Sequence, residues 1–312
     1  GLRGIVEYDP AELTFTALAG TPVAEVAAAL GEHAQHLPFD PPLVDAGATL
    51  GGAVAAGTSG PGAIRHGGVR DFVIGVRLID GTGRVIAGGG KVVKNAAGFD
   101  LPKLLVGSIG RLGIMTQLSF KVFPRPRSTT TLAFALGSTE DAVTRMTTLV
   151  RGPQTLDALD LEAGGRLLVR LGGDAATLEA RAARVARTIG SAPERVDGPA
   201  EAELWHDASE FTWAPRSSAL ARVALTARHV LALESATAGA ALRVSLGGNV
   251  AWIAWPGDRP LDELDQALQR LDLAGLVLRG AAAHPLLGAR RGGAFAERVG
   301  RALDPHSRFL EV

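Results

Sequence analysis

Two glycine-rich stretches contain most of the backbone that could bind a cofactor. The first is DAGATLGGAVAAGTSGPG, residues 45–62, and the second is GSIGRLG, residues 107–113. Because glycine has no Cβ, a ligand can approach its N–H group closely, so such segments suit a pyrophosphate or the pyrimidine edge of a flavin. Glycines that only form tight turns between strands would explain either stretch taken alone. At this level both interpretations stay open.

Other common kinds of active site lack their characteristic residues. The chain has no GxSxG motif, no Walker loop and no GxGxxG after a strand, and its seven histidines form neither HxH nor HExxH. We therefore expect no serine hydrolase, no phosphate-binding P-loop and no metal site. The absence of cysteine excludes a thiolate nucleophile and a cysteine-ligated iron–sulfur cluster on this chain.

One histidine has charged neighbours in the sequence. His284 lies close to Arg279 and Arg290, which could pair with a carboxylate. A lone histidine and two arginines are more often ordinary surface or core residues, and we favour that interpretation for all three. The sequence therefore assigns no catalytic residue.

Composition limits the size of the fold and the class of partner. At 312 residues the chain exceeds the usual length of one domain, so we expect two lobes. Its 32 basic and 32 acidic residues balance, which argues against nucleic acid as a partner. No apolar run reaches the roughly 20 residues of a membrane span, and no signal pattern opens the chain. We therefore expect a soluble intracellular protein.

The first lobe is predicted to open with two strands and a helix. Residues 4–19 alternate around Asp9-Pro10, which favours a hairpin, and Thr21 could cap the helix that follows. Thr49 could cap a short helix. Further predictions are a strand pair that turns at residues 80–81, a short helix in GFDLPKLLVGS, and a strand pair after residue 113.

The second lobe is predicted to begin at Ser128, where strands and helices alternate more plainly. Ser138 and Asp141 form a capping signal for the first helix. The segments expected to be extended include LDALDLEA, RLLVRLGG, ALARVAL, HVLALESA, VAWIAWPG and GLVLRG, and those expected to be helical include ATLEARAARVARTIG and LDELDQALQRL. The tail beginning FAERVGRAL is predicted to be a helix that ends at Asp304-Pro305.

Five blocks in fixed order resemble the flavin domain of the vanillyl-alcohol oxidase/para-cresol methylhydroxylase (PCMH) superfamily. The blocks are VEYDPAELTFTALAGTPVAEVAAAL, LPFDPP, GATLGGAVAAGTSG, GGVRDFVIGVRLIDGTGRVI and KNAAGFDLPKLLVGSIGRLGIMTQLSFKVFPRPR. The resemblance implies an α+β fold, with a PCMH-type FAD-binding domain that lacks its first N-terminal motif, plus a smaller α+β cap domain with an antiparallel sheet. It implies the FAD-binding domain over residues 1–127, the cap over 128–284, and a tail, 285–312, that returns to the first domain.

The resemblance also implies FAD as cofactor and a set of residues that contact it. Ile109 and Arg111 stand where many relatives have an acidic residue and threonine, so contact at the second glycine-rich stretch would come from the backbone. The implied cofactor-binding residues are Pro42, Ala48, Thr49, Gly51, Gly52, Ser59, Gly60, Asp71, Gly110, Gly113 and Ile114.

Within the superfamily, the chain is most similar to the E subunits of bacterial glycolate oxidases. This resemblance implies an FAD-binding accessory or electron-transfer subunit, with a catalytic flavoprotein D subunit and an iron–sulfur F subunit as partners and a small 2-hydroxy acid as substrate of the complex. It implies a cytoplasmic location, with membrane association only through the complex. Two alternatives stay open, a stand-alone FAD-dependent 2-hydroxy acid oxidoreductase and a flavin-free scaffold subunit.

Overall fold

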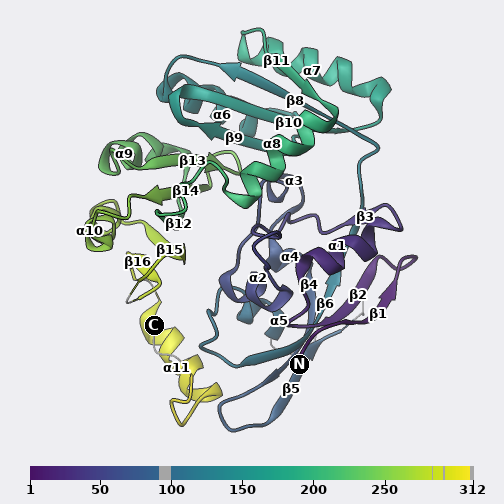
Figure 1. The fold of residues 1–312 in the computed structure, drawn as a ribbon, viewed down its shortest axis with the longest axis vertical. Coiled ribbons are helices and arrows are strands. Elements are labelled where there is room, and N and C mark those ends of the chain that lie inside the picture. The colour runs from purple at the N-terminus through teal and green to yellow at the C-terminus, as the bar shows by residue number, and fades with distance from the viewer. Residues whose placement is uncertain (91–99, 283, 291, 310–312) are drawn as a thin grey trace. The chain divides into compact units, whose positions relative to one another are not determined.

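The computed structural model describes residues 1–90, 100–282, 284–290 and 292–309. The block KNAAGF at residues 94–99, part of the resemblance, lies outside the described residues. The chain forms two compact units, one of residues 1–125 together with the C-terminal segment from residue 292, and one of residues 126–291 (Figure 1). Each unit has its own sheet, so each is described by itself.

The first unit is built on a five-stranded antiparallel sheet. Its strand order is β1-β2-β6-β4-β5, which places the first hairpin beside the last long strand of the unit. The predicted turn at Asp9 is confirmed, because the Asp9 carboxylate accepts the N–H groups of Ala11 and Glu12. The strands are β1 Ile5–Asp9, β2 Thr14–Leu18, β4 Val73–Ile79, β5 Val85–Gly89 and β6 Ile114–Lys121, with a separate two-stranded pair of β3 Gln35–His36 and β7 Phe123–Pro124.

The helices of the first unit begin close to the predicted positions, with one correction. They are α1 Val23–Gly31, α2 Leu50–Ala56, α3 Ala63–His66, α4 Val69–Phe72, α5 Leu101–Leu105 and α11 Gly293–Leu303. Thr49 caps α2 as predicted. The expectation that Thr21 caps α1 was wrong, because its buried hydroxyl donates instead to Leu18 O at 2.7 Å.

Aromatic side chains fill the core between this sheet and its helices. Phe15, Phe39 and Phe120 are fully buried, and the Phe120 ring lies 5.4 Å from Phe15 and 5.9 Å from Phe39 between centroids. Burial of one such ring stabilises a fold by roughly 1.5–3 kcal/mol. These three rings join β2, β6 and the segment before α2, which fixes the glycine-rich stretch on the sheet.

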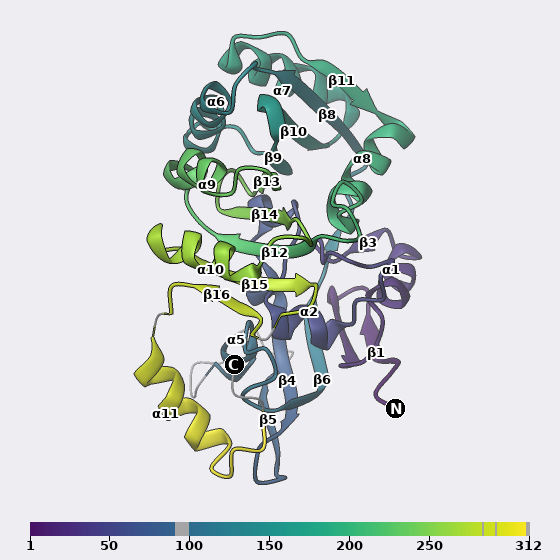
Figure 2. The same cartoon turned by 60° about the vertical axis from the view of Figure 1, so that its left-hand side comes forward.

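The turn between β4 and β5 receives the C-terminal segment. Figure 2 shows the chain at the end of α11 beside this turn. The Gly81 N–H donates to Leu303 O at 2.7 Å, and a Cβ at residue 81 would stand 2.1 Å from an oxygen of Asp304. Asp304 in turn accepts the N–H of Phe309 at 2.7 Å. Only glycine at residue 81 therefore lets the end of α11 approach this turn so closely.

Asp80 gives this turn an acid-sensitive contact. Its buried carboxylate accepts hydrogen bonds from the Thr82 hydroxyl, at 2.5 Å, and from the Thr82 and Arg84 N–H groups, and these lower the pKa of Asp80 from 3.8 to about 2. Because the folded pKa lies below the unfolded one, the contribution to stability is present above about pH 4 and is lost as pH falls toward 2.

We expect the Asp80 carboxyl to titrate with a midpoint near 2 in a ¹³C NMR titration of the folded chain. Replacing Thr82 with alanine removes the hydroxyl donor, the largest cause of the shift, so the midpoint should move up toward 3.8. A wild-type midpoint already near 3.8 would contradict the geometry of this turn.

The second unit is built on a nine-stranded antiparallel sheet, the larger of the two. Its order is β11-β8-β10-β9-β13-β14-β12-β15-β16. The strands are β8 Ser128–Ala135, β9 Ala158–Glu162, β10 Arg166–Gly173, β11 Glu194–Asp197, β12 Ala219–Ala224, β13 Ala241–Ser245, β14 Val250–Trp255, β15 Ala274–Arg279 and β16 Leu286–Gly288. The helices are α6 Thr139–Arg151, α7 Ala175–Ile189, α8 Gly198–Glu210, α9 Val230–Ala236 and α10 Leu261–Arg270.

One strand prediction in this unit was wrong. The segment HVLALESA was expected to be extended, but residues 230–236 form helix α9, whose Val230 and Leu233 are buried three residues apart. The apolar residues of such a short segment are compatible with either a strand or a helix. Burial against the rest of the unit selects the helix. The predicted cap of α6 is confirmed, because the Ser138 hydroxyl accepts the N–H of Asp141.

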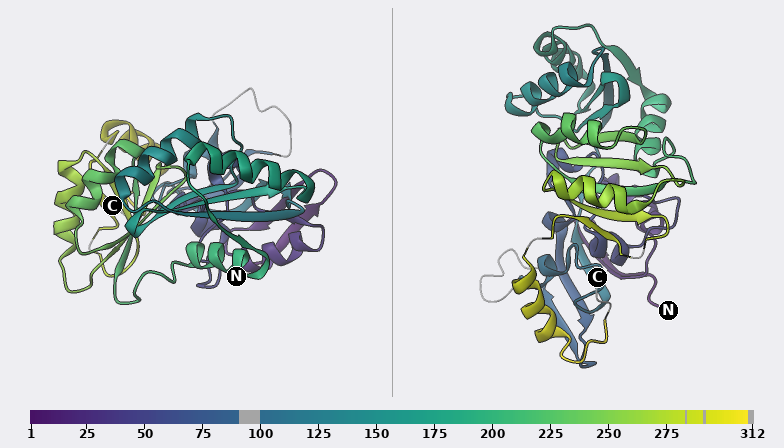
Figure 3. Two further views of the ribbon diagram at one scale, coloured as in Figure 1. Left: turned by 90° about the horizontal axis from the view of Figure 1, so that it is seen from above. Right: turned by 90° about the vertical axis from the view of Figure 1, so that its left-hand side faces the viewer.

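Helix α8 lies on the opposite face of the sheet from α6 and α7 (Figure 3). Its Trp205 side chain is buried and donates from Nε1 to the Thr131 hydroxyl of β8 at 2.8 Å. Its Glu201 carboxylate accepts from Nε and Nη2 of Arg170 on β10. Trp205 and Phe211 therefore belong to the core of this unit rather than to its surface.

Among the described residues, no helix is both long enough and apolar enough to cross a membrane.

Candidate functional site

The predicted cofactor-binding stretches meet around helix α2 in the first unit. The N–H groups of Gly107 and Ile109 both donate at 2.9 Å to α2, at Val54 O and Ala55 O. On the other side, the Ser59 hydroxyl accepts the N–H of Val69 at 3.0 Å and joins the end of the first stretch to α4. Residues 45–62 and 67–71 are thus brought together with residues 107–113, which lie much later in the sequence.

The first turn of α2 uses its own N–H groups inside the chain. Leu50 N–H donates to Thr21 O at 3.1 Å, Gly51 N–H to Ala19 O at 2.7 Å, and Gly52 N–H to the Thr49 hydroxyl at 3.1 Å. These donors are the ones that a phosphate group would otherwise take at a helix start. A cofactor beside α2 therefore has to be held at other positions.

Three of the predicted site glycines are required by packing. A Cβ at Gly51 would stand 2.9 Å from Ala19 O, one at Gly60 would stand 2.3 Å from Asp40 O, and one at Gly113 would stand 2.4 Å from the Leu78 side chain. Real Cβ atoms do not approach so closely, so no larger residue fits without a shift of the chain. The packing interpretation of the glycine-rich stretches accounts for these three positions.

Other glycines of the same stretches leave open space. A Cβ at Gly52 would meet only the Thr49 hydroxyl, at 3.2 Å, and at Gly107 and Gly110 it would meet no atom within 4 Å. Gly107 and Gly110 have φ of +77° and +75°. The space beside their Cα atoms is thus open to the close approach of a flat ring, although the Gly107 N–H is already bonded to Val54 O, and this geometry fits the cofactor that the resemblance implies. Gly107 was not among the predicted contacts, although it lies in the same stretch.

Backbone strain marks the loop that carries these open glycines. Ile109, between Gly107 and Gly110, has φ of +52°, a conformation that costs a β-branched residue about 1–2 kcal/mol. Its N–H bond to Ala55 O holds the strained backbone against α2. Strain of this kind persists where surrounding contacts hold it, as this hydrogen bond does.

The remaining predicted residues have structural roles or lie at the edge of this group. The Asp71 carboxylate accepts the N–H of Gly68 at 2.9 Å and caps α4. Ala48 N–H donates to Leu43 O at 3.0 Å, Pro42 is buried, and Ile114 is 54% exposed at the start of β6. In the other unit, Arg279 Nη2 donates to Pro215 O and Arg290 Nη2 to Leu286 O, whereas His284 is exposed.

Comparison with protein families matches residues 1–89 to a family described as FAD binding domain. The chain is 52% identical to glycolate oxidase subunit GlcE of Escherichia coli (strain K12) over 130 residues, which cover 42% of this chain and 37% of that protein. It is 32% identical to glycolate oxidase subunit GlcD of Bacillus subtilis (strain 168) over 162 residues, 51% of this chain and 34% of that protein.

A D-lactate dehydrogenase of Archaeoglobus fulgidus is a further relative, 35% identical over 118 residues that cover 37% of this chain and 27% of that protein. The chain thus spans about a third of the length of the curated relatives it matches. Comparison of structures finds alkyldihydroxyacetonephosphate synthase in two crystal forms, with a TM-score of 0.69 and 15% identity over 98% of this chain and 66% or 65% of that one. At this identity the likeness concerns the fold alone, and the predicted α+β fold class is confirmed. The expectation that the second domain is the smaller one was wrong, because its unit comprises residues 126–291 and has the nine-stranded sheet.

Proposed function

We propose that this chain, a GlcE-like protein with an FAD binding domain of the PCMH type, acts as an accessory, electron-transferring part of a glycolate oxidase complex. The observation that carries the proposal is the 52% identity to GlcE, together with the match of residues 1–89 to the FAD binding domain. The relatives named glycolate oxidase and D-lactate dehydrogenase support a 2-hydroxy acid as the substrate of the whole complex.

FAD is the cofactor of this domain, and the residues around α2 are proposed to hold it. Bound FAD would supply the capacity to accept and pass on electrons. Gly107 and Gly110 leave space beside their Cα atoms for a ligand, and the Thr49 hydroxyl keeps the first turn of α2 fixed by accepting the Gly52 N–H. We propose that residues 1–127 form the cofactor-binding domain, to which the tail of residues 285–312 returns, and that residues 128–284 form the cap.

Partners are proposed from the same relatives. A catalytic flavoprotein D subunit and an iron–sulfur F subunit would complete the complex, and any membrane association would come through it, from the cytoplasmic side. This chain has no cysteine, so the thiolate ligands of an iron–sulfur cluster must come from another chain.

The experiment that tests the proposal measures flavin, turnover and assembly with the full chain. The visible spectrum of the purified chain should show flavin. Addition of glycolate to the isolated chain should leave that flavin oxidised. The chain should also co-purify with tagged D and F subunits. Bleaching by glycolate in isolation would instead favour a stand-alone oxidoreductase. A chain without flavin that still co-purifies with the D and F subunits would favour the scaffold alternative.

A substitution at Gly52 separates cofactor contact from folding. Because a Cβ there would stand 3.2 Å from the Thr49 hydroxyl and near no other atom, Gly52→Val needs only a small shift of that side chain to fold. By filling the space beside α2 it should weaken FAD binding at least tenfold, as measured by quenching of FAD fluorescence. Gly300→Val is the control, because Gly300 is also a helical glycine and a Cβ there would meet no atom within 4 Å. Unchanged FAD affinity in Gly52→Val, with an unchanged melting temperature, would place the cofactor elsewhere.

A further inference from the structure

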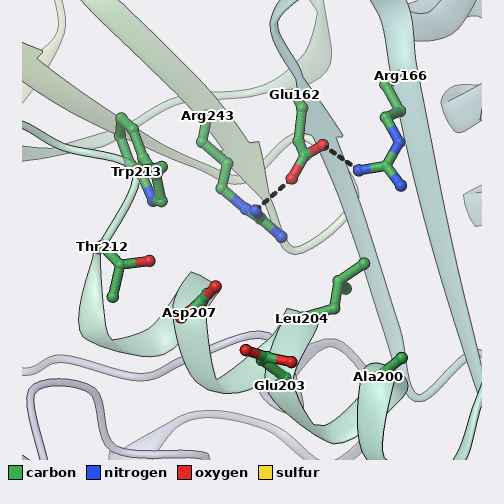
Figure 4. A pocket seen from close by; sticks show the side chains of 9 residues that line it. All are labelled: Glu162, Arg166, Ala200, Glu203, Leu204, Asp207, Thr212, Trp213 and Arg243. Atoms are coloured by element: carbon green, nitrogen blue, oxygen red, sulfur yellow. Dashed lines mark hydrogen bonds and ion pairs between the residues drawn. The ribbon is translucent and has the colours of Figure 1, made fainter.

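A pocket of about 430 Å³ lies wholly within the second unit, between α8 and the central strands β9, β10 and β13 of the sheet (Figure 4). It is formed by residues that the sequence did not single out as a site. Its wall combines two features that the fold by itself does not need. They are buried N–H donors without a hydrogen-bond acceptor, and carboxylates without a basic side chain as partner among the described residues. These features define what the pocket can bind.

The first donor is the guanidinium of Arg243 on β13, whose side chain is only 6% exposed. Its Nε donates to Asp160 at 2.9 Å and its Nη1 to Glu162 at 2.7 Å. Its Nη2 is buried and has no hydrogen-bond partner among the described residues. Glu162 also accepts from Arg166 at 2.9 Å, so this carboxylate is already shared between two arginines.

The second donor is the indole N–H of Trp213, in the segment that follows α8. Trp213 Nε1 is buried, and the described part of the chain provides no acceptor for it. Figure 4 shows the Trp213 ring and the Arg243 guanidinium on the same side of the pocket. Buried donors are normally paired, so two such donors on one wall indicate that an acceptor group completes the site.

The opposite wall is acidic. Glu203 and Asp207 lie four residues apart on α8 and therefore on one face of that helix. Within the described ranges, neither carboxylate has a hydrogen bond or ion pair. Asp207 and the hydroxyl of Thr212 point toward the space below Arg243 (Figure 4). A cation placed there would meet two negative charges, neither of which is paired with an arginine or a lysine among the described residues.

We propose that this pocket binds a small amino carboxylate, with its carboxylate at Arg243 and Trp213 and its ammonium group at Glu203 and Asp207. A simple carboxylate would leave the two acidic side chains unpaired and would be repelled by them. A simple amine would leave both buried N–H donors without an acceptor. A ligand that carries both charges satisfies both walls, and Leu204 provides apolar contact for the chain between them.

The test uses the indole N–H signal of Trp213 in ¹⁵N–¹H spectra of the full chain, which contains four tryptophans. The probes are glycine, β-alanine, 4-aminobutanoate and 6-aminohexanoate, in which the distance between the two charges increases stepwise. The comparison compounds are butanoate and butylamine, which carry one charge each. We expect at least one amino carboxylate to shift the Trp213 signal saturably, and both comparison compounds to bind at least tenfold more weakly.

Three variants complete the test. Trp213→Phe assigns the signal because the variant lacks it. The variant keeps an aromatic side chain but no N–H donor, so it should bind about fivefold more weakly when measured by calorimetry. Asp207→Asn should weaken binding at least fivefold, whereas Glu140→Gln, an exposed acidic residue on α6, should have no effect. The proposal is overturned if no probe shifts the signal up to 20 mM, roughly the weakest binding that such a site would show. It is also overturned if butanoate or butylamine binds as tightly as the best amino carboxylate.

Discussion

Replacement of Asp160 by alanine is expected to lower the free energy of unfolding of the second unit by about 3–5 kcal/mol. Asp160 is fully buried and accepts from Arg243 Nε at 2.9 Å and from the Ser245 hydroxyl at 2.8 Å. Without it, the buried Arg243 charge retains Glu162 as its one ion-pair partner among the described residues, and the Ser245 hydroxyl loses its acceptor. Urea-induced unfolding followed by tryptophan fluorescence measures the loss.

The size of this effect reflects the cost of an unpaired charge rather than the strength of the ion pair. Burial raises the pKa of Asp160 although Arg243 opposes the rise, so even the paired carboxylate is costly to keep ionised. An Asp160→Ala, Arg243→Met double variant should therefore regain much of the stability that the single variant loses. Equal destabilisation in the single and double variants would contradict this account.

An exposed ion pair in the same unit provides the matched control. Glu263 accepts from Arg259 at 2.9 Å on the surface of α10, with the two side chains 51% and 32% exposed. Because water screens such a pair, Glu263→Ala should change the free energy of unfolding by only about 0–1 kcal/mol. The contrast with Asp160→Ala separates burial from charge as the cause of the effect.

Local signals in the sequence predicted those features whose interactions lie within a few residues. Thr49 caps α2 through the N–H of Gly52, and Ser138 caps α6 through the N–H of Asp141, each three residues away. The turn at Asp80 is likewise held by hydrogen bonds to Thr82 and Arg84. Such contacts depend on spacing alone, so the sequence pattern is sufficient to predict them.

Features that depend on distant partners were not predictable in this way. Thr21 has the residue type and position of a helix cap, but its hydroxyl is drawn to Leu18 O inside the core. The pocket of the second unit needs Arg243 from β13 beside Trp213, which follows α8, and no spacing in the sequence brings these together. Helix α9 was missed because only tertiary burial selects its helical pattern.

The glycines of the candidate site show the same limit most clearly. From the sequence, Gly51 and Gly52 are equally good candidates for contact with a ligand. In the structure, a Cβ at Gly51 would stand 2.9 Å from Ala19 O, whereas one at Gly52 would meet only the Thr49 hydroxyl. The distinction depends on β2 and the loop after it, which lie more than thirty residues earlier in the chain. A glycine-rich motif therefore predicts close approach to the backbone but not what approaches it.

Gly113→Ala is expected to destabilise the first unit by about 3 kcal/mol, because a strained backbone and an overfilled core each cost 1–3 kcal/mol. Gly113 has φ of +151°, and a Cβ there would stand 2.4 Å from Leu78 Cδ1 and 3.0 Å from Ile79 O. Leu78 is fully buried, so its side chain has little room to withdraw. The melting temperature of this unit in calorimetry measures the effect.

Gly110→Ala, three residues earlier, is the matched comparison for cofactor contact. Gly110 has φ of +75° but nothing within 4 Å of a Cβ, so alanine should cost only about 1 kcal/mol. If the backbone at residue 110 faces FAD, this variant should lose FAD affinity while it stays folded, whereas Gly113→Ala should lose FAD only together with the fold. A folded Gly113→Ala variant of normal stability that fails to bind FAD would instead show that residue 113 contacts the cofactor directly, as the family resemblance alone implied.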